Sequence, residues 1–242
     1  GVCVKGWREE GDGVVLETDG QAVRARYAVN CGGLFSDRIA RLAGLAPEVK
    51  IVPFRGEYYE LVTEKCYLVK NLVYQVPNPA FPFLGVHLTR GIDGHVHVGP
   101  NAVLSLKREG YHKRDFSWRD SLETLTYPGF WRIVARYGRL GMGEMIRAWS
   151  KQIFLQRVQA FLPEVRSDDL KPAPAGVRAQ AMTRDGRLLD DFSIRREGRG
   201  IHVLNAPSPA ATASLMIGQT IAKKILDVAE DIGSHIVHVV KN

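Results

Sequence analysis

The chain has 242 residues, enough for one large domain or two small ones, and its 45% hydrophobic and 24% charged residues are ordinary for a soluble globular protein. The net charge of +7 comes from basic residues that are mixed with acidic ones along the chain, which excludes a concentrated nucleic-acid-binding tract. No apolar run approaches the roughly 20 residues that span a bilayer, and no signal-peptide pattern is present.

Cysteine usage bears on the cellular compartment. Cys3, Cys31 and Cys66 form no C-x-x-C pair, and their odd number argues against a disulfide scaffold. Sparse, unpaired cysteines fit a reducing compartment, so we expect a cytoplasmic protein.

The first 50 residues read as short strands that lead into a helix. Alternating apolar residues predict a β-meander over residues 2–29, which ends at Gly32 and Gly33. A helix is expected over Ser36–Ala43, with Gly44 at its end. Paired glycines between a strand and a helix let the backbone approach a ligand closely, although a tight structural turn gives the same pattern.

The middle of the chain is predicted to form an antiparallel sheet followed by helices. Short strand-like runs are separated by Pro, Asn and Gly turns: 50–62, 66–76, 81–89 and 95–104. Apolar residues at helical spacing follow over 117–162, and Pro163 ends that region.

Strands return over 170–205, and the segment Ile201–Leu226 reads as a strand, a proline-rich turn and a long helix. Ser208 can cap this helix, and Pro209 can occupy its first position. The small side chains of the turn leave backbone N–H groups open, which favours a negatively charged ligand. The alternative is a capped helix in an α/β layer without a ligand.

One family resemblance runs through these segments. The run NAPSPAATASL (205–215) resembles the C-terminal flavin motif of FAD-dependent L-2-hydroxyglutarate oxidases and dehydrogenases, members of the D-amino-acid-oxidase-like superfamily. Further segments resemble the same family in the same order: VNCGGLFSDRIARLAG (29–44), VPFRGEYYEL (52–61), FPFLGVH (81–87), VGPNAVLSLKREGY (98–111), SKQIF (150–154) and PAGVRAQAMTRDGRLLDDF (174–192). Collinear segments are more specific than any single short motif.

The resemblance implies an α/β fold that is α+β in its substrate half. Residues 1–50 and 172–242 would form part of a Rossmann-like FAD-binding domain, and residues 51–171 an inserted substrate domain with an antiparallel sheet and helices. The family's N-terminal G-x-G-x-x-G turn holds the FAD pyrophosphate, and no such motif follows a strand in this sequence. The chain therefore resembles the C-terminal portion of the family.

The resemblance also implies which residues bind FAD. They lie on the first strand, in the glycine loop and in the turn before the last helix: Val4, Gly32, Gly33, Ala206, Pro207, Ser208, Ala210, Ala211 and Thr212.

The implied substrate is an α-hydroxy dicarboxylate, L-2-hydroxyglutarate, which is oxidised to 2-oxoglutarate. Arg178 lies where the superfamily places a carboxylate-binding arginine, and Arg55 is the second candidate. Asn101 could line the pocket, whereas the neighbouring Lys107 and Arg108 read as surface charge. His87 is the candidate base for the hydroxyl proton, with a hydrogen-bonded sheet histidine as its alternative.

No metal is expected, although His95 and His97 lie two residues apart on a further strand. The implied electron acceptor is a quinone or oxygen, with no nucleic-acid partner. The basic charge leaves peripheral association with the inner membrane open.

Two alternatives stay open beside this hypothesis. One is another FAD-dependent oxidoreductase of the superfamily, acting on an amino acid or glycerol 3-phosphate. The other is a non-catalytic fragment. Because the pyrophosphate-binding turn is missing, we expect residues 1–242 alone to bind FAD weakly or not at all, to show no dehydrogenase activity and to aggregate through open sheet edges.

Overall fold

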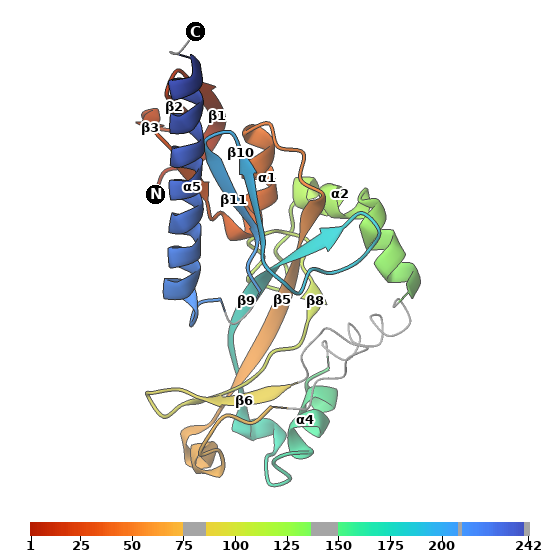
Figure 1. The fold of residues 1–242 in the computed structure, drawn as a ribbon. Helices are drawn as coiled ribbons and strands as arrows, with labels where there is room; N and C mark the ends of the chain where they lie inside the picture. The colour runs from red at the N-terminus through yellow and green to blue at the C-terminus, as the bar shows by residue number, and fades with distance from the viewer. Residues whose placement is uncertain (75–85, 137–149, 208–209, 240–242) are drawn as a thin grey trace. The chain divides into compact units, whose positions relative to one another are not determined.

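The computed structural model describes residues 1–74, 86–136, 150–207 and 210–239. The chain divides into two compact units (Figure 1). Unit 1 comprises Gly1–Ile51 and Gln180–Asn242, and unit 2 comprises Val52–Ala179. The expected domain boundaries lay at 50/51 and 171/172. Two long strands, β5 (Val49–Leu61) and β9 (Leu170–Thr183), carry the chain from one unit to the other.

Unit 1 contains two small sheets. The first is an antiparallel meander in the order β1-β2-β3, formed by Val4–Glu10, Gly13–Thr18 and Val23–Ala25. The turn between its first two strands contains Gly11 with φ of 60°, a left-handed conformation that favours glycine. The second sheet has the order β10-β11-β4, formed by Ser193–Glu197, Gly200–Asn205 and Ala28–Asn30. In this sheet β4 and β11 are parallel, so their carboxyl ends point the same way.

Unit 1 also contains helices. The 3-10 helix η1 (Gly33–Phe35) leads directly into α1 (Ser36–Leu42), which ends before Gly44, a residue with φ of 86°. Ile39 of α1 packs against a small core of Trp7, Val14 and Ala28, which joins the meander to β4. The last helix, α5 (Ser214–Val239), is drawn in blue in Figure 1.

Unit 2 is built on a five-stranded sheet in the order β6-β7-β5-β8, with β9 also paired to β5. Besides β5 and β9, its strands are β6 (His87–Arg90), β7 (Val96–Gly99) and β8 (Val103–Leu104). β7 and β8 both pair antiparallel with β5, and the turn between them contains the cis peptide bond Gly99–Pro100.

Helices and a large core complete unit 2. Its 3-10 helices include η2 (Thr63–Leu68) and η3 (Ser167–Asp169), and its α-helices include α2 (Trp118–Leu125) and α4 (Lys151–Gln159). Ser117 and Ser150 cap α2 and α4 by accepting hydrogen bonds from backbone N–H groups of the first turn. The core gathers one face of the sheet and α4: Leu61, Cys66, Val69, Val86, Leu88, Val96, Val98, Phe154, Leu155, Val158, Val165 and Leu170.

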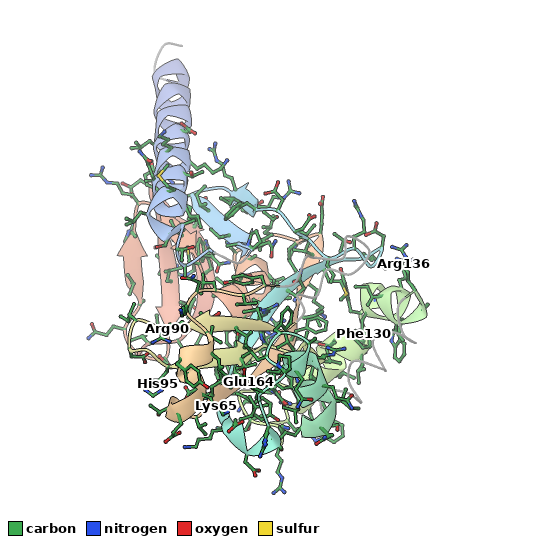
Figure 2. All side chains as sticks on the ribbon, turned by 90° about the horizontal axis from the view of Figure 1, so that it is seen from below. Lys65, Arg90, His95, Phe130, Arg136 and Glu164 are labelled. Atoms are coloured by element: carbon green, nitrogen blue, oxygen red, sulfur yellow. The ribbon has the colours of Figure 1, made fainter. Side chains whose placement is uncertain are left out.

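One corner of unit 2 is tied together by a side chain. The guanidinium of Arg90 on β6 donates to the backbone oxygens of Cys66 (2.9 Å), inside η2, and of Val69 (3.0 Å), directly after it. Figure 2 labels Arg90 together with Lys65 of η2 in this corner. These bonds fix the segment that leads to Val73, which forms a bridge with Leu88.

The expected fold class is confirmed: unit 1 mixes helices with a parallel strand pair, and unit 2 has an antiparallel sheet. A strand over 66–76 was wrong in part, because Cys66–Leu68 lie in η2, where the Cys66 thiol contacts the backbone oxygens of Leu61 and Val62. Ser208 and Pro209 lie outside the described residues, and α5 begins only at Ser214, after the helix start expected at Pro209.

In the described part of the chain, no helix combines the length and the apolar character that crossing a bilayer requires.

Candidate functional site

The two segments expected to contact flavin leave neighbouring parallel strands. β4 and β11 pair with the register Ala28 to Gly200 and Asn30 to His202. Residues 31–35 therefore leave the same edge of the sheet as residues 206–207. Ligands of open α/β sheets bind outside the carboxyl ends of parallel strands. The expectation that the two segments share one edge follows from this pairing.

Gly33 supplies an open stretch of backbone at this edge. It has φ of 51°, it is exposed, and a side chain added to it would meet no atom within 4 Å. Gly32 is different, since a Cβ there would lie 2.6 Å from the Ile39 side chain and 3.0 Å from Oδ1 of Asn30. Gly32 thus permits close packing inside the protein, while Gly33 leaves room for something outside it.

A buried polar pair holds the glycine loop in place. Asn30 Oδ1 accepts a 3.0 Å hydrogen bond from the Gly32 N–H, and its amide nitrogen donates to the Ser36 carbonyl at 2.8 Å. The same nitrogen lies 3.2 Å from Nδ1 of His202, whose ring is fully buried against Trp7. Burial lowers the pKa of His202, so the ring is held neutral near pH 7.

The second flavin segment consists of small side chains. After Asn205 the chain is exposed at Ala206, Ala211 and Thr212 and half-buried at Pro207 and Ala210, and Ser208 lies outside the described residues. Val4, the remaining expected contact, begins β1 and therefore belongs to the other sheet of unit 1.

His87 lies in unit 2, in a row of residues across the sheet. It pairs with Gly99 of β7, and its half-buried ring stacks on Tyr74 with centroids 4.9 Å apart. Gly99 has φ of 142°, and a Cβ there would lie 2.8 Å from the Glu57 carbonyl and 3.1 Å from the Tyr58 ring. Only glycine fits at this point, because the Glu57 carbonyl and the Tyr58 ring occupy the space that a side chain would need.

Arg55 is buried in an ion-pair cluster. Its guanidinium donates to the His112 carbonyl at 2.8 Å and to Glu57 at 3.2 Å, and the second oxygen of Glu57 lies 3.2 Å from the Lys113 ammonium. Arg55 and Glu57 are 6% and 8% exposed. The arginine is therefore largely engaged by the protein itself.

The side chains of Arg55 and His87 point to opposite faces of the sheet in unit 2. Tyr59 pairs with Val98, which pairs with Leu88, so this row faces the core of unit 2. Arg55 and Glu57 precede Tyr59 on β5 by an even number of residues, so their side chains point to the same face of the sheet as Tyr59. His87 is adjacent to Leu88 and faces the other way. The structure does not bring these two expected substrate residues to one face.

Asn101 holds the turn after β7 in place by two hydrogen bonds with the backbone of Glu57. Its side-chain oxygen accepts a 2.9 Å hydrogen bond from the Glu57 N–H, and its own N–H donates to the Glu57 carbonyl at 3.3 Å. Asn101 is buried, and these bonds replace ladder bonds where the strand pairing is interrupted. The side-chain oxygen of Asn101 therefore already accepts a hydrogen bond within the sheet.

Arg178 lies on β9 and is half-buried. No hydrogen bond or ion pair of its guanidinium is found within the described residues. The nearby Gly176 would accept a Cβ without meeting any atom within 4 Å, so the chain next to Arg178 is open. Among the expected carboxylate-binding residues, Arg178 is the one with a guanidinium available to a ligand.

Arg108 was wrongly expected to be a surface charge. It is 2% exposed, and its guanidinium lies 3.1 Å from Glu123 of α2, while its N–H donates to the buried Asp120 at 2.9 Å. These bonds tie the segment after β8 to α2. The sequence KRE suggested solvated charge, and no signal in it distinguished the buried arginine from its exposed neighbours.

The histidines of the β6–β7 hairpin do not assemble a metal site. His97 pairs with Glu60 across the sheet at 3.3 Å, and His95 sits in the exposed turn. Within the residues that the structure describes, no group of three His, Cys, Asp or Glu side chains could hold a metal ion.

Comparison with known proteins places the chain among flavoproteins. Residues 1–224 match the family described as FAD dependent oxidoreductase. The L-2-hydroxyglutarate dehydrogenases of Indibacter alkaliphilus and Escherichia coli K12 are each 49% identical, over 86% and 92% of this chain. The mitochondrial L-2-hydroxyglutarate dehydrogenase of Homo sapiens is 45% identical over 88% of it. The chain spans 53% of the length of the two bacterial relatives and 47% of the human one.

Solved structures give the same fold. L-alpha-glycerophosphate oxidase from Mycoplasma pneumoniae, solved with FAD bound, aligns over 94% of this chain and 50% of its own, with a TM-score of 0.60 and 15% identity. Glycine oxidase from Geobacillus kaustophilus aligns over 93% and 48%, with a TM-score of 0.54 and 16% identity. The family match, which covers most of the chain, is decisive: the chain belongs to the FAD-dependent oxidoreductase family.

Proposed function

We propose that this chain is the C-terminal portion of an FAD-dependent enzyme that oxidises L-2-hydroxyglutarate to 2-oxoglutarate. The observation that carries the proposal is the 45–49% identity to relatives named L-2-hydroxyglutarate dehydrogenase over 86–92% of this chain. The structure supports it with two candidate sites of different construction, a backbone site in unit 1 and a side-chain site in unit 2.

In this proposal unit 1 contributes to FAD binding. The contacts are Val4, Gly32, Gly33, Ala206, Pro207, Ser208, Ala210, Ala211 and Thr212. A large planar cofactor fits the open backbone at Gly33 and the exposed small residues after β11. Gly33 has no side chain and the residues after β11 have small ones, so neither place hinders its approach. Bound FAD would supply the acceptor for the hydride that leaves the substrate carbon.

Unit 2 supplies the groups that bind and deprotonate the substrate. Arg178 binds a substrate carboxylate, since a guanidinium fork matches a carboxylate bidentately. His87 takes the proton of the substrate hydroxyl as the carbon loses its hydride, which leaves the 2-oxo product. The Nδ1 atom of His87 is buried, so we assign this proton transfer to Nε2.

Arg55 and Asn101 have an indirect role in the proposal. Arg55 adds positive charge beneath the sheet while its nitrogens bond to His112 and Glu57. Asn101 fixes the turn that keeps Gly99 beside His87. Neither needs to touch the substrate for the reaction to proceed.

The electron acceptor in this proposal is a quinone or oxygen, and the enzyme is cytoplasmic and peripheral at the inner membrane. Exposed apolar side chains on α2 support a membrane contact: Trp118 is 82% exposed, and Leu122 and Leu125 follow it at helical spacing. Comparing oxygen consumption with quinone reduction, in the presence and absence of vesicles, tests this assignment.

The test of function uses the protein expressed from its complete reading frame. We expect a bound flavin that is bleached without oxygen by L-2-hydroxyglutarate, with release of 2-oxoglutarate. D-2-Hydroxyglutarate, glycerol 3-phosphate, glycine and L-proline serve as comparison substrates. Bleaching by one of these instead, with none by L-2-hydroxyglutarate, would overturn the substrate assignment while leaving the flavin assignment intact.

A further inference from the structure

The ring of Tyr74 covers one side of the His87 imidazole. Their centroids are 4.9 Å apart with an interplanar angle of 29°, which is a stacked arrangement. Tyr74 is 54% exposed, so the tyrosine is not part of the core and its position needs another explanation. Neither the fold nor the core of unit 2 requires an aromatic residue at this place.

Backbone pairing sets the stack. Val73 and Leu88 exchange two hydrogen bonds of 2.9 Å each in an isolated antiparallel bridge. The next residues along each chain, Tyr74 and His87, are therefore directly opposite one another and on one face. Arg90 strengthens the arrangement, because its bonds to the Cys66 and Val69 carbonyls hold the segment that leads to Val73.

Different groups border the two sides of His87. On one side stands the Tyr74 ring, and on the other side the paired residue is Gly99, beside which the Tyr58 ring packs. A stacked neighbour limits the rotation of the imidazole ring.

We propose that Tyr74 is a positioning residue for His87: its ring stacks on the imidazole and holds it ready to take the substrate's hydroxyl proton. This inference rests on the role proposed for His87. An aromatic face also attracts a cation, so the stack favours the protonated imidazole that forms during the reaction. The phenol oxygen has no part in this, and phenylalanine should serve equally well.

Other ionisable groups on this face of the sheet remain in place when Tyr74 is changed. Glu60 and His97 pair with each other at 3.3 Å, and Tyr58 packs beside Gly99 on the far side from Tyr74. A change in the titration of His87 that follows a substitution at Tyr74 can therefore be assigned to the loss of the stack.

The experiment compares Tyr74→Leu with Tyr74→Phe in the protein from the complete reading frame. Leucine keeps an apolar cover but has no π face. We expect Tyr74→Leu to lower kcat about tenfold with KM changed less than twofold, because orientation is lost and binding is kept. The acidic limb of the kcat/KM profile should move to lower pH by about half a unit. Tyr74→Phe should restore both values.

Tyr67→Ala is the matched control. Tyr67 is 62% exposed on η2 and makes no ring contact with His87, so its loss should leave both measurements unchanged. A Tyr74→Leu enzyme with the wild-type profile, or with a raised KM and unchanged kcat, would overturn the positioning role.

A second readout does not depend on turnover. Titration of the His87 ring by NMR should show a midpoint about half a unit lower in Tyr74→Leu than in wild type. If the wild-type protein oxidises no 2-hydroxy acid, the proposed function fails, yet this shift still decides whether the stack acts on His87. An identical midpoint in the two proteins rejects the inference.

Discussion

The two units place their candidate sites on different parts of the polypeptide. In unit 1 the site consists of backbone: a glycine with open space above it and a run of small residues after a parallel strand. In unit 2 it consists of side chains, His87 and Arg178, which project from antiparallel strands. A site made of backbone accepts few residue types at its own positions, but it does not depend on one particular strand register as long as the backbone stays exposed. A side-chain site depends on which face of the sheet each residue occupies.

The largest effect is expected at Arg178, where the side-chain site can be broken most directly. Replacing it by methionine removes a charged hydrogen bond to a carboxylate, at a cost of about 2–5 kcal/mol, so kcat/KM for L-2-hydroxyglutarate should fall about 30-fold or more. Steady-state kinetics measure this. Arg187→Met is the control, since Arg187 is exposed and pairs with the exposed Asp185 at 2.8 Å. Equal kcat/KM values for the two variants would remove Arg178 from the site.

Arg108 tests whether buried charge in unit 2 is structural. Arg108→Met leaves Glu123 without its buried cation, while the backbone N–H of residue 108 can still donate to Asp120, and the free energy of unfolding should fall by about 3 kcal/mol. Urea unfolding measures this. Arg119→Met removes an exposed arginine that contacts the same Glu123, so a loss below about 1 kcal/mol is expected. Similar losses in both variants would show that burial of Arg108 contributes little.

Gly33 tests whether the backbone site of unit 1 depends on glycine. Alanine at φ of 51° costs about 1–2 kcal/mol of stability, and the added methyl group should weaken FAD binding by occupying the open space. Gly176→Ala is matched to it, because a Cβ there also meets nothing within 4 Å but φ is not positive. Thermal unfolding and flavin titration compare them. A Gly33→Ala protein that equals Gly176→Ala in both would contradict the backbone site.

The smallest effect concerns His202 beneath the glycine loop. Its pKa is lowered in the folded state by burial, so the unfolded state binds the proton more readily. The folded protein is therefore fully stabilised above the unfolded-state pKa of about 6.5 and loses stability as pH falls below it. Urea unfolding at about pH 7.5 and about pH 5.5 should show this loss, and a smaller loss in His202→Gln. Equal pH dependence in the two proteins would argue against His202 as the source.

Sequence patterns predicted the elements better than they predicted the contacts. The alternation in KIVPFRGEYYELV predicted β5, and the glycine after the apolar series predicted the end of α1. The 3-10 helix at Cys66–Leu68 escaped because a short run of consecutive apolar residues looks the same in a strand and in a short helix. The start of α5 escaped because a proline can also stand in the turn before a helix.

In the candidate sites too, local backbone features were easier to predict from the sequence than contacts between distant residues. The turn at Gly33 was predictable, because paired glycines between a strand and a helix indicate a tight turn whether or not a ligand binds there. The burial of Arg108 was not, since it depends on Asp120 and Glu123, which approach only when α2 packs. The separation of Arg55 from His87 was also hidden, because it depends on the pairing of β5 with β7 and of β7 with β6. The stack on Tyr74 requires the Val73–Leu88 bridge, which joins residues on separate strands.

The alternation along β5 has a consequence for how this part of the protein can vary in length. Arg55, Glu57 and Tyr59 point to one face, and Tyr58 and Glu60 to the other. Losing a single residue in this strand would exchange every later side chain between core and surface, burying Glu60 and expelling Tyr59. We expect natural insertions and deletions to be absent from β5 and to collect in exposed turns such as 91–94, where no ladder is shifted.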